Sequence, residues 1–355
     1  MNTPKSASAP ASAPVLALHE LRGGALHGVT LEVAQGRCVG LLGAQQALQA
    51  VLDAASGLRP VAGRVQVRGH EVGHFPAHRR GLARAPAAPL GEGRTVEAAL
   101  RFATRDGRAA AMTRLLAEQA GLEARQPLAA LDRAGLRLVA LMQAAATAPA
   151  CLLAMAGPED GDAARLAKLL QALTAQGQAV LLATPDPAIA MELSDCGVVL
   201  VEGTTRQAGA WRALHESPVD AAVACLLGPC NLLPAMVEQT EDDSLILRLP
   251  TGDLVEARGE ALPPGRACLV GIRPSLVAAA PIGNFGVLGE GMLAGRVRDL
   301  RFVGGALRIA VTLGADPAQP LELIVERPAA APAPFAPGSR IGVAWQPHHA
   351  LAFRA

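Results

Sequence analysis

The residues around position 43 have the types and the order of a phosphate-binding site. A buried strand is expected over 37–42 (RCVGLL), followed by Gly43 and by a helical pattern over 45–55. Backbone N–H groups at such a strand–glycine–helix turn can bind phosphate oxygens. Binding and cleaving a nucleoside triphosphate further requires a Lys for the terminal phosphates and a Ser or Thr for the magnesium ion.

The stretch after this strand lacks those side chains. It reads GAQQALQAVLDAASG over 43–57, with neither Lys nor Thr, and its one Ser stands next to the last glycine. The Lys position falls on Gln49 when counted from Gly43, and on Leu48 when counted back from Gly57. Because the whole chain contains only two lysines, neither of them near this stretch, no other alignment supplies the missing ammonium group.

Two further patterns have residue types that bind metal ions. The run HEVGH at 70–74 satisfies the HExxH spacing of zinc hydrolases, which needs both histidines on one helical face. Gly73 and Pro76 disfavour a helix there, so we expect a solvated loop. The acidic stretch EDGD at 159–162 suggests a hard cation, but it is more typical of a turn that caps the following helix. We therefore nominate no metal ligand.

The elements that position these residues alternate between strand and helix. Strands are expected at 15–21, 29–33, 64–67, 151–155, 179–183 and 197–201, and helices at 95–105, 107–120, 131–147, 162–175 and 187–194. This alternation predicts a mainly parallel sheet covered by helices on both faces. The charge-free stretch 138–157 is long enough to cross a membrane, but Pro149 interrupts it. We expect a buried helix and a buried strand there instead.

After about residue 228 the pattern changes to short strands separated by turn signals. The expected strands are 244–249, 252–257, 267–272, 292–299, 306–313, 321–326, 340–345 and 349–353. They predict an all-β module that forms a small barrel. We therefore expect a disordered tail at 1–14, an α/β domain at 15–227 and a β domain at 228–355.

The composition argues against several classes of function. The 32 Lys and Arg nearly balance the 31 Asp and Glu, so no basic surface for nucleic acid is expected. Six Phe, two Trp and no Tyr leave few rings on which bases could stack. Six scattered cysteines without a CxxC pair favour reduced thiols over a zinc site. Arg79, Arg80 and the arginines of 296–301 are expected on solvated or salt-bridged faces.

Four stretches resemble one family in order and spacing: GVTLEVAQGRCVGLLG (28–43), SGLRPVAGRVQVRG (56–69), HESPVDAAVACLLGPCNLLPA (215–235) and VGIRPSLVAAAP (270–281). The chain resembles the ATP-binding subunits of ABC-type importers, in particular the polyamine (spermidine/putrescine) type with a C-terminal transport-associated OB-like domain. The resemblance covers about residues 15 to 354. It implies a P-loop NTPase-like ABC cassette with a helical subdomain, followed by an OB-like barrel.

The resemblance also assigns functional positions, most of which hold the wrong residue. The vestigial nucleotide-binding positions are Gly43, Ala44, Gln45, Gln46, Gln49 and Ala50. The signature loop aligns with Leu131, Asp132, Arg133, Ala134 and Gly135, so that an acid replaces its Ser. The magnesium-binding Asp and the catalytic Glu fall on Met155 and Ala156, or on Ala156 and Gly157. Ala85 replaces the loop Gln, Pro185 replaces the switch His, and only Asp162 matches.

The family binds ATP and magnesium and works as a cassette dimer beneath permease subunits, on the inner face of the cell membrane. The resemblance therefore implies a cytoplasmic, peripheral cassette subunit that has lost most of its ATPase chemistry, and we expect no catalytic residue. No aromatic residue precedes residue 75, so the usual adenine-stacking ring is missing as well. Two other functions remain open: an active import ATPase with an unusual site, and a regulatory module whose β domain senses a ligand.

Overall fold

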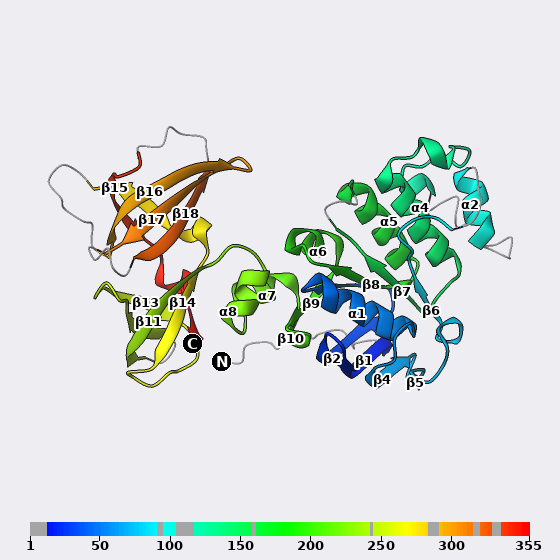
Figure 1. Ribbon diagram of the computed structural model, residues 1–355, viewed down its shortest axis with the longest axis horizontal. Helices are drawn as coiled ribbons and strands as arrows, with labels where there is room; N and C mark the ends of the chain where they lie inside the picture. Colours follow the sequence, from blue (N-terminus) through cyan, green and yellow to red (C-terminus); the bar gives the residue numbers. More distant parts are fainter. Residues whose placement is uncertain are drawn as a thin grey trace, which may run out of the picture. The chain divides into compact units, whose positions relative to one another are not determined.

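The computed structural model describes residues 13–90, 95–103, 117–157, 161–241, 244–282, 291–314, 320–328 and 335–355. Chain packing divides it into two compact units, Met1–Ser217 and Pro218–Ala355, shown in Figure 1. The short helix α8 (Ala221–Leu226) lies between this division and the boundary at 227/228 expected from the sequence. Of the predicted disordered tail at 1–14, only the last two residues are described, and Pro14 already belongs to the first strand.

The first unit contains a 10-stranded sheet in the order β5-β4-β1-β2-β10-β9-β3-β8-β7-β6. Its parallel half consists of β9 (Cys196–Val201), β3 (Cys38–Leu42), β8 (Ala179–Thr184), β7 (Cys151–Met155) and β6 (Leu82–Arg84). The other strands are β1 (Pro14–Gly23), β2 (Leu26–Ala34), β4 (Ala62–Val67), β5 (His70–Glu71) and β10 (Thr204–Gly209). The expectation of a mainly parallel sheet therefore holds for only half of it, because tight hairpins join β1 to β2 and β4 to β5 as antiparallel pairs.

Helices cover both faces of this sheet. They are α1 (Gln45–Ser56), α2 (Val96–Ala103), α4 (Arg133–Ala146), α5 (Ala163–Ala175), α6 (Pro187–Leu193) and α7 (Trp211–Glu216). The helix expected at 107–120 falls largely outside the described residues, while β10, α7 and α8 were not expected. None of the described helices is long and apolar enough to cross a membrane.

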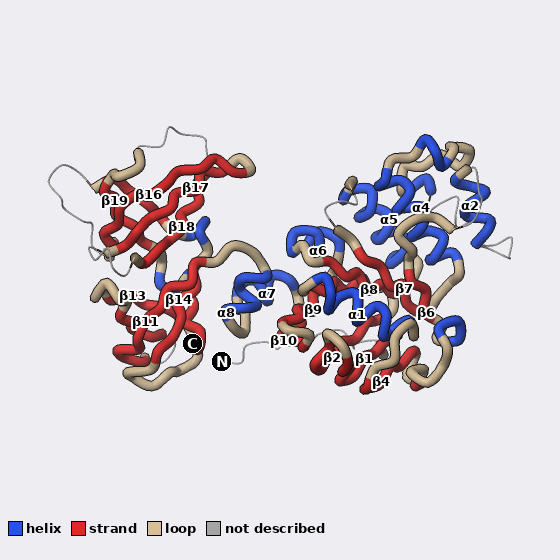
Figure 2. Tube along the Cα trace, viewed as in Figure 1, coloured by secondary structure: helices blue, strands red, loops and turns tan. Residues whose placement is uncertain are grey.

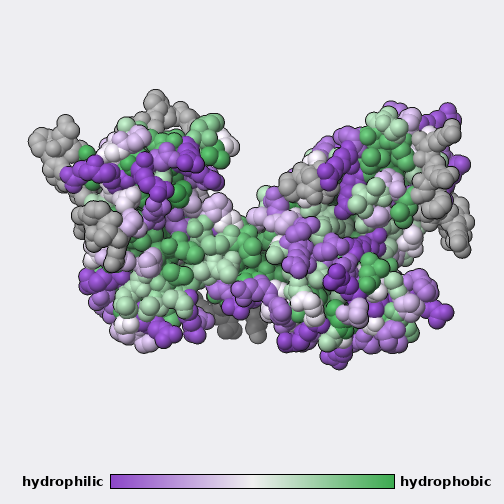
Figure 3. Space-filling view, viewed as in Figure 1, coloured by the Kyte–Doolittle hydropathy of each residue, from purple (hydrophilic) through white to green (hydrophobic). Residues whose placement is uncertain are grey.

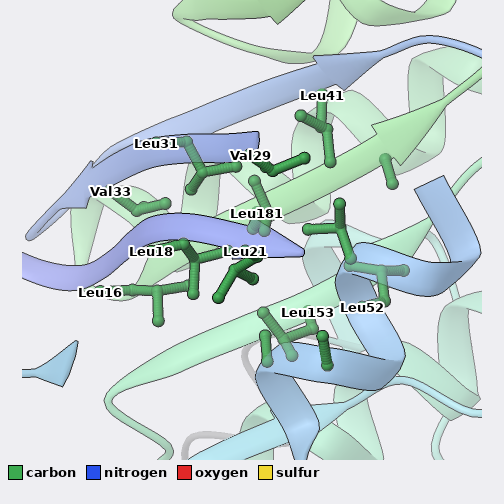
Figure 4. Close-up of a cluster of buried hydrophobic side chains, with 14 of the residues drawn as sticks. Leu16, Leu18, Leu21, Val29, Leu31, Val33, Leu41, Leu52, Leu153 and Leu181 are labelled. Carbon is green, nitrogen blue, oxygen red and sulfur yellow. The ribbon is translucent and has the colours of Figure 1, made fainter. Parts of the chain in front are cut away.

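Two hydrophobic clusters hold the sheet between its helices. On one face Leu52 of α1 packs with Leu153 and Leu181 and with leucines and valines of β1 and β2 (Figure 4). On the other face Leu152 and Ala154 pack with side chains of α4 and α5. Successive residues of β7 thus point into different clusters, as alternation along a strand requires. This explains why its sequence is apolar throughout, and it confirms that 138–157 forms a buried helix and a buried strand.

The second unit is built almost entirely of strands, drawn red in Figure 2. A closed barrel has the order β11-β12-β13-β20-β14, and a 5-stranded sheet has the order β15-β19-β16-β17-β18. The barrel strands are β11 (Asn231–Thr240), β12 (Ser244–Arg248), β13 (Leu254–Arg258), β14 (Ala267–Ile272) and β20 (Leu351–Arg354). The sheet strands are β15 (Ala278–Pro281), β16 (Leu293–Val303), β17 (Ala306–Leu313), β18 (Leu321–Pro328) and β19 (Arg340–Ala344).

The predicted barrel is confirmed, but it uses only half of the strands. A shared core, with Val270 from the barrel and Val311 and Val343 from the sheet, joins the two halves. Strands β11 and β15 were missed in the sequence. Hydrophilic side chains gather over β16 and β17 in Figure 3. There Arg301 pairs with Asp299 at 2.6 Å and Arg298 pairs with Glu322, as expected of a salt-bridged face.

Candidate functional site

The turn after β3 is too short to enclose a phosphate. Strand β3 ends at Leu42 and α1 begins at Gln45, so only Gly43 and Ala44 connect them. The amide N–H groups of Ala47 and Leu48 already donate to the Ala44 carbonyl, at 2.9 and 3.1 Å. A phosphate loop instead needs several consecutive non-helical residues whose N–H groups converge on the phosphates. Here those residues have become the first turn of a helix.

Gly43 itself is fixed by close packing against β9. A Cβ atom added to Gly43 would lie 3.0 Å from both the Cβ atom and the carbonyl oxygen of Leu200. The strand-to-helix turn therefore needs glycine for space, which explains why this residue persists although the loop around it has changed.

Two of the side chains at the vestigial nucleotide positions, those of Gln45 and Gln49, bond to the protein. Ala44, Gln45 and Gln46 are exposed, and Gln49 and Ala50 are half-buried. Of the two candidates for the Lys position, Leu48 lies in the hydrophobic core and Gln49 reaches the surface. The Gln49 amide donates to Oδ1 of Asp53 at 3.4 Å, one turn along α1.

A pocket of about 520 Å³ opens beside this face of α1. Gln46, Gln49, Ala50 and Asp53 line it from the helix, and Gly23, Gly24, Ala25, Arg59, Pro60 and Val61 line the rest. None of these residues is aromatic, so the described wall offers no ring for a base to stack on. Asp53 supplies the carboxylate in the described wall of this pocket. This carboxylate pairs with Arg84 and, at 3.7 Å, with Arg59.

The parallel strands bring four of the predicted positions to one edge of the sheet. Gly43 follows β3, Ala85 follows β6, Met155 ends β7 and Pro185 follows β8. The carboxyl ends of parallel strands are where ligands of such sheets bind. The start of α1 contacts one of these strand ends, because Nε2 of Gln45 donates to Sδ of Met155 at 3.2 Å.

Among the described residues, this edge lacks the groups that magnesium and ATP require. Magnesium prefers oxygen ligands, whereas Met155 offers a thioether and Ala156 a methyl group. Asp186 carries a carboxylate nearby in the sequence, but its Oδ1 accepts from the amides of Ala188 and Ile189 and so caps α6. Among the described residues no cluster could hold a metal ion. The residues present therefore do not fit a magnesium-bound triphosphate.

A guanidinium group that sequence reasoning missed lies at the same edge. Arg137 projects from α4 and donates to the carbonyl of Pro86 at 2.6 Å and to the carbonyl of Met155 at 2.5 Å. It thus ties the segment after β6 and the end of β7 to α4. The only signal in the sequence is a charged residue inside the otherwise apolar run 134–142.

The signature-loop residues form the start of α4. The carboxylate of Asp132 caps the helix and accepts from the Gly135 amide at 2.7 Å. The acid therefore occupies an amide that could otherwise bind an anion, and adds negative charge at the helix N-terminus. Leu131 packs against the core beside α4. Asp162 acts in the same way for α5, accepting from the Arg165 amide at 3.1 Å.

The HExxH run does not form a zinc site. His70 and Glu71 form β5, which pairs with β4 in a hairpin rather than lying on a helix. Oε1 of Glu71 accepts from the amides of Val65 and Gly73, at 3.1 and 2.9 Å. The expected solvated loop is thus a short hairpin strand followed by a turn. Of the acidic stretch 159–162, residues 159 and 160 lie outside the described residues.

Comparison with known proteins identifies relatives of both units. A profile of the TOBE domain family matches residues 270–353. Over 349 residues the chain is 26% identical to the spermidine/putrescine import ATP-binding protein PotA of Acidothermus cellulolyticus, covering 92% of this chain and 88% of that protein. A solved structure of an ATP-binding subunit of an ABC transporter matches with a TM-score of 0.46 and 22% identity, over 55% of this chain and 90% of that chain.

Two other relatives match over shorter stretches. The PotA protein of Ruegeria pomeroyi is 35% identical over 101 residues, which are 28% of this chain and 27% of that protein. The Fe(3+) ions import ATP-binding protein FbpC of Agrobacterium fabrum is 29% identical over 136 residues, which are 38% of this chain and 36% of that protein. The chain thus aligns with little more than a third of the FbpC protein and with less than a third of this PotA protein. The chain is a homologue of the ATP-binding subunits of ABC-type importers, with a cassette-like α/β unit followed by a TOBE domain.

Proposed function

We propose that this chain is a cassette subunit of an ABC-type importer that hydrolyses little or no ATP. The observation that carries the proposal is the connection between β3 and α1, where Gly43 and Ala44 alone replace a phosphate loop. The unit that contains this connection has a parallel half-sheet with helices on both faces, and the second unit contains the match to the TOBE domain family. The chain thus keeps the architecture of its relatives without the groups that act on a triphosphate.

The size of the chemical loss supports this proposal. Phosphoryl transfer depends almost entirely on positioning and electrostatic stabilisation of the transferring group. Loss of one stabilising donor typically costs about 2.7–4 kcal/mol, or about 10²–10³ in rate. Here Gln49 replaces the Lys, Met155 and Ala156 replace the two acids, and Pro185 replaces the His. Such losses are not additive, but none of the four replacing side chains can do what the replaced one does.

A partner cassette would not obviously restore the site. In the family, each site combines the phosphate loop of one chain with the signature loop of the other. This chain is altered in both, at Gly43–Ala50 and at Asp132. A mixed dimer would have one site without the Lys and another with a carboxylate in place of the signature Ser.

We further propose that the chain acts at the inner face of the cell membrane, with permease subunits and a second cassette as partners. A polyamine-type importer is the preferred assignment, because the alignment that spans nearly the whole chain is with a spermidine/putrescine protein. Ferric-iron importers are the second candidate, since an Fe(3+) relative also aligns. Affinity purification of the tagged chain from membranes tests this proposal: permease subunits should be recovered, and their absence would refute it.

Phosphate release from the purified chain with magnesium and ATP tests the enzymatic part. We expect turnover far below about 1 s⁻¹, the lower end of ordinary enzyme rates. The Gly43→Val variant is the matched control, because its side chain would collide with Leu200 at the turn. Turnover of about 1 s⁻¹ or more in the natural chain, abolished in the variant, would show that the chain is an active ATPase.

A further inference from the structure

Two adjoining cavities lie at the amino ends of the parallel strands, at the edge of the sheet opposite Gly43. Their volumes are about 290 and 410 Å³, and they share Arg68, Ala148, Pro149 and Ala150 in their walls. Leu82, the first residue of β6, lines one cavity, and Gln178, which precedes β8, lines the other. We call the two together the amino-edge groove. Because parallel strands have their two ends at opposite edges, this groove is separate from the site around α1.

The groove carries positive charge and neutral polar groups. Arg68 and His78 line it, and both are exposed. Neither makes an ion pair or a side-chain hydrogen bond with the described residues. The amides of Gln35 and Gln176 and the hydroxyl of Thr147 also line it, together with apolar side chains such as Val15, Leu82 and Leu173. None of the described lining residues has a carboxylate, so an anion would meet no opposing charge from them.

The walls of the groove are held in place by the backbone. Arg68 and Ala148 both have positive φ angles, 50° and 49°, which residues other than glycine rarely adopt. The Arg68 amide donates to the carbonyl of Val15 at 2.8 Å, and the Ala150 amide donates to the carbonyl of Gly81 at 2.7 Å. Nε2 of Gln178 donates to the Pro149 carbonyl at 3.0 Å. At Arg68 the positive φ belongs to the two-residue turn of the β4–β5 hairpin, in which Gly69 has a φ of 79° as well, so the hairpin fixes where the Arg68 side chain begins.

We infer that the amino-edge groove is a binding site for a small metabolite that carries an oxyanion, a phosphate ester or a polycarboxylate. A guanidinium group matches two oxygens of such an anion with two parallel N–H groups, and no described residue bonds to the Arg68 guanidinium. The amides and the hydroxyl are suited to the polar body of the ligand. Each cavity has about the size of pockets that hold small molecules, which are typically about 300–1,000 Å³.

Isothermal titration of the full chain with inorganic pyrophosphate, and separately with citrate, tests the inference. The tighter of the two identifies the class of anion, and Arg68→Ala should weaken its binding at least tenfold. His78→Ala should weaken it less, because the imidazole contributes one contact. Arg64→Ala is the matched control: Arg64 is exposed on β4, the strand that Arg68 directly follows, but lies outside both walls, so its loss should change affinity less than twofold.

Four results would overturn the inference. The first is that neither anion binds. The second is that Arg68→Ala and Arg64→Ala weaken binding equally, which would indicate general electrostatic attraction. The third is that Gln46→Ala, in the wall of the pocket beside α1, abolishes binding while Arg68→Ala does not. This last result would place the anion at the carboxyl edge. Circular dichroism spectra of all variants should match that of the natural chain, and a folded Arg68→Ala variant with undiminished affinity would also refute the site.

Discussion

Replacing Arg137 by leucine should loosen the edge of the sheet where the nucleotide positions meet. The Arg137 guanidinium donates to the carbonyls of Pro86 and Met155, at 2.6 and 2.5 Å, and thereby links α4 to the ends of two strands. Leucine keeps most of the aliphatic volume but removes both donors. The two carbonyls would then need water, in a place that is partly buried.

The expected loss in the free energy of unfolding follows from the two hydrogen bonds of the Arg137 guanidinium. A hydrogen bond to a charged group contributes about 1.5–3 kcal/mol when buried. Arg137 is half-buried, so solvent screening reduces each bond, and we expect Arg137→Leu to lower the free energy of unfolding by about 2–3 kcal/mol in total. For a unit of this size a loss of 1 kcal/mol lowers Tm by about 2–4 °C, so Tm should fall by about 5–10 °C.

Thermal unfolding followed by circular dichroism measures the overall loss. Hydrogen exchange then locates it, because the amides of Ala85 and Ala156 should exchange faster in the variant. Arg133→Leu is the control: Arg133 is an exposed residue on the same helix, and its loss should change stability by less than about 0.5 kcal/mol. Equal losses in the two variants, or unchanged exchange at the sheet edge, would refute the argument.

Three further outcomes are expected. Asp132→Ala should lower the free energy of unfolding, measured with urea, by about 0.5–2 kcal/mol, because α4 loses its N-terminal cap. Asp132→Asn should keep most of this free energy, because the Asn side chain can also accept from the Gly135 amide. Iodoacetamide should label the exposed Cys225 of the folded chain first, whereas Cys151 should react only on unfolding, because burial raises the pKa of its thiol to about 12. Burial, and then the charges of His348 and Arg258, lower the pKa of His349, so the unfolded state binds its proton more readily. The contribution of His349 to the free energy of unfolding is therefore fully present above a pH of about 6.5 and is lost as the pH falls. The His349→Gln variant should have a weaker dependence of the free energy of unfolding on pH, measured between about pH 5 and 7.5.

Local patterns in the sequence predicted a large part of the fold. The apolar run of β7 and the helical spacing of α1 are properties of consecutive residues, so both elements could be placed from the sequence. The same is true of the Asp162 cap, which needs only the helix that follows it. The positions Gln49 and Met155 were predicted by counting from Gly43 and from the apolar strand run, with Leu48 and Ala156 in the neighbouring registers, and they stay predictions.

Long-range partners account for what was missed. Arg80 was expected on a solvated or salt-bridged face, but it is 8% exposed and donates to the carbonyls of Ala54 and Ala55 at the end of α1. Arg137 was not recognised because its acceptors, the carbonyls of Pro86 and Met155, lie on other elements. The second sheet of the β unit was missed for a related reason. A list of strands does not say which of them pair, and only pairing separates a barrel from a barrel with an added sheet.

The short connection at Gly43–Ala44 also bears on evolutionary reversibility. A Gln49→Lys change would place an ammonium group on a helical turn next to Asp53, one turn along α1, where it would meet a carboxylate before it met a nucleotide. Forming a phosphate loop here would require residues 45–48 to leave the helix, together with acids at the end of β7. No residue is missing between Gly43 and Gln49, because the Lys position falls on Gln49 when counted from Gly43. The Gln49→Lys change alone would therefore leave the backbone of residues 45–48 helical, with their N–H groups unable to converge on a phosphate.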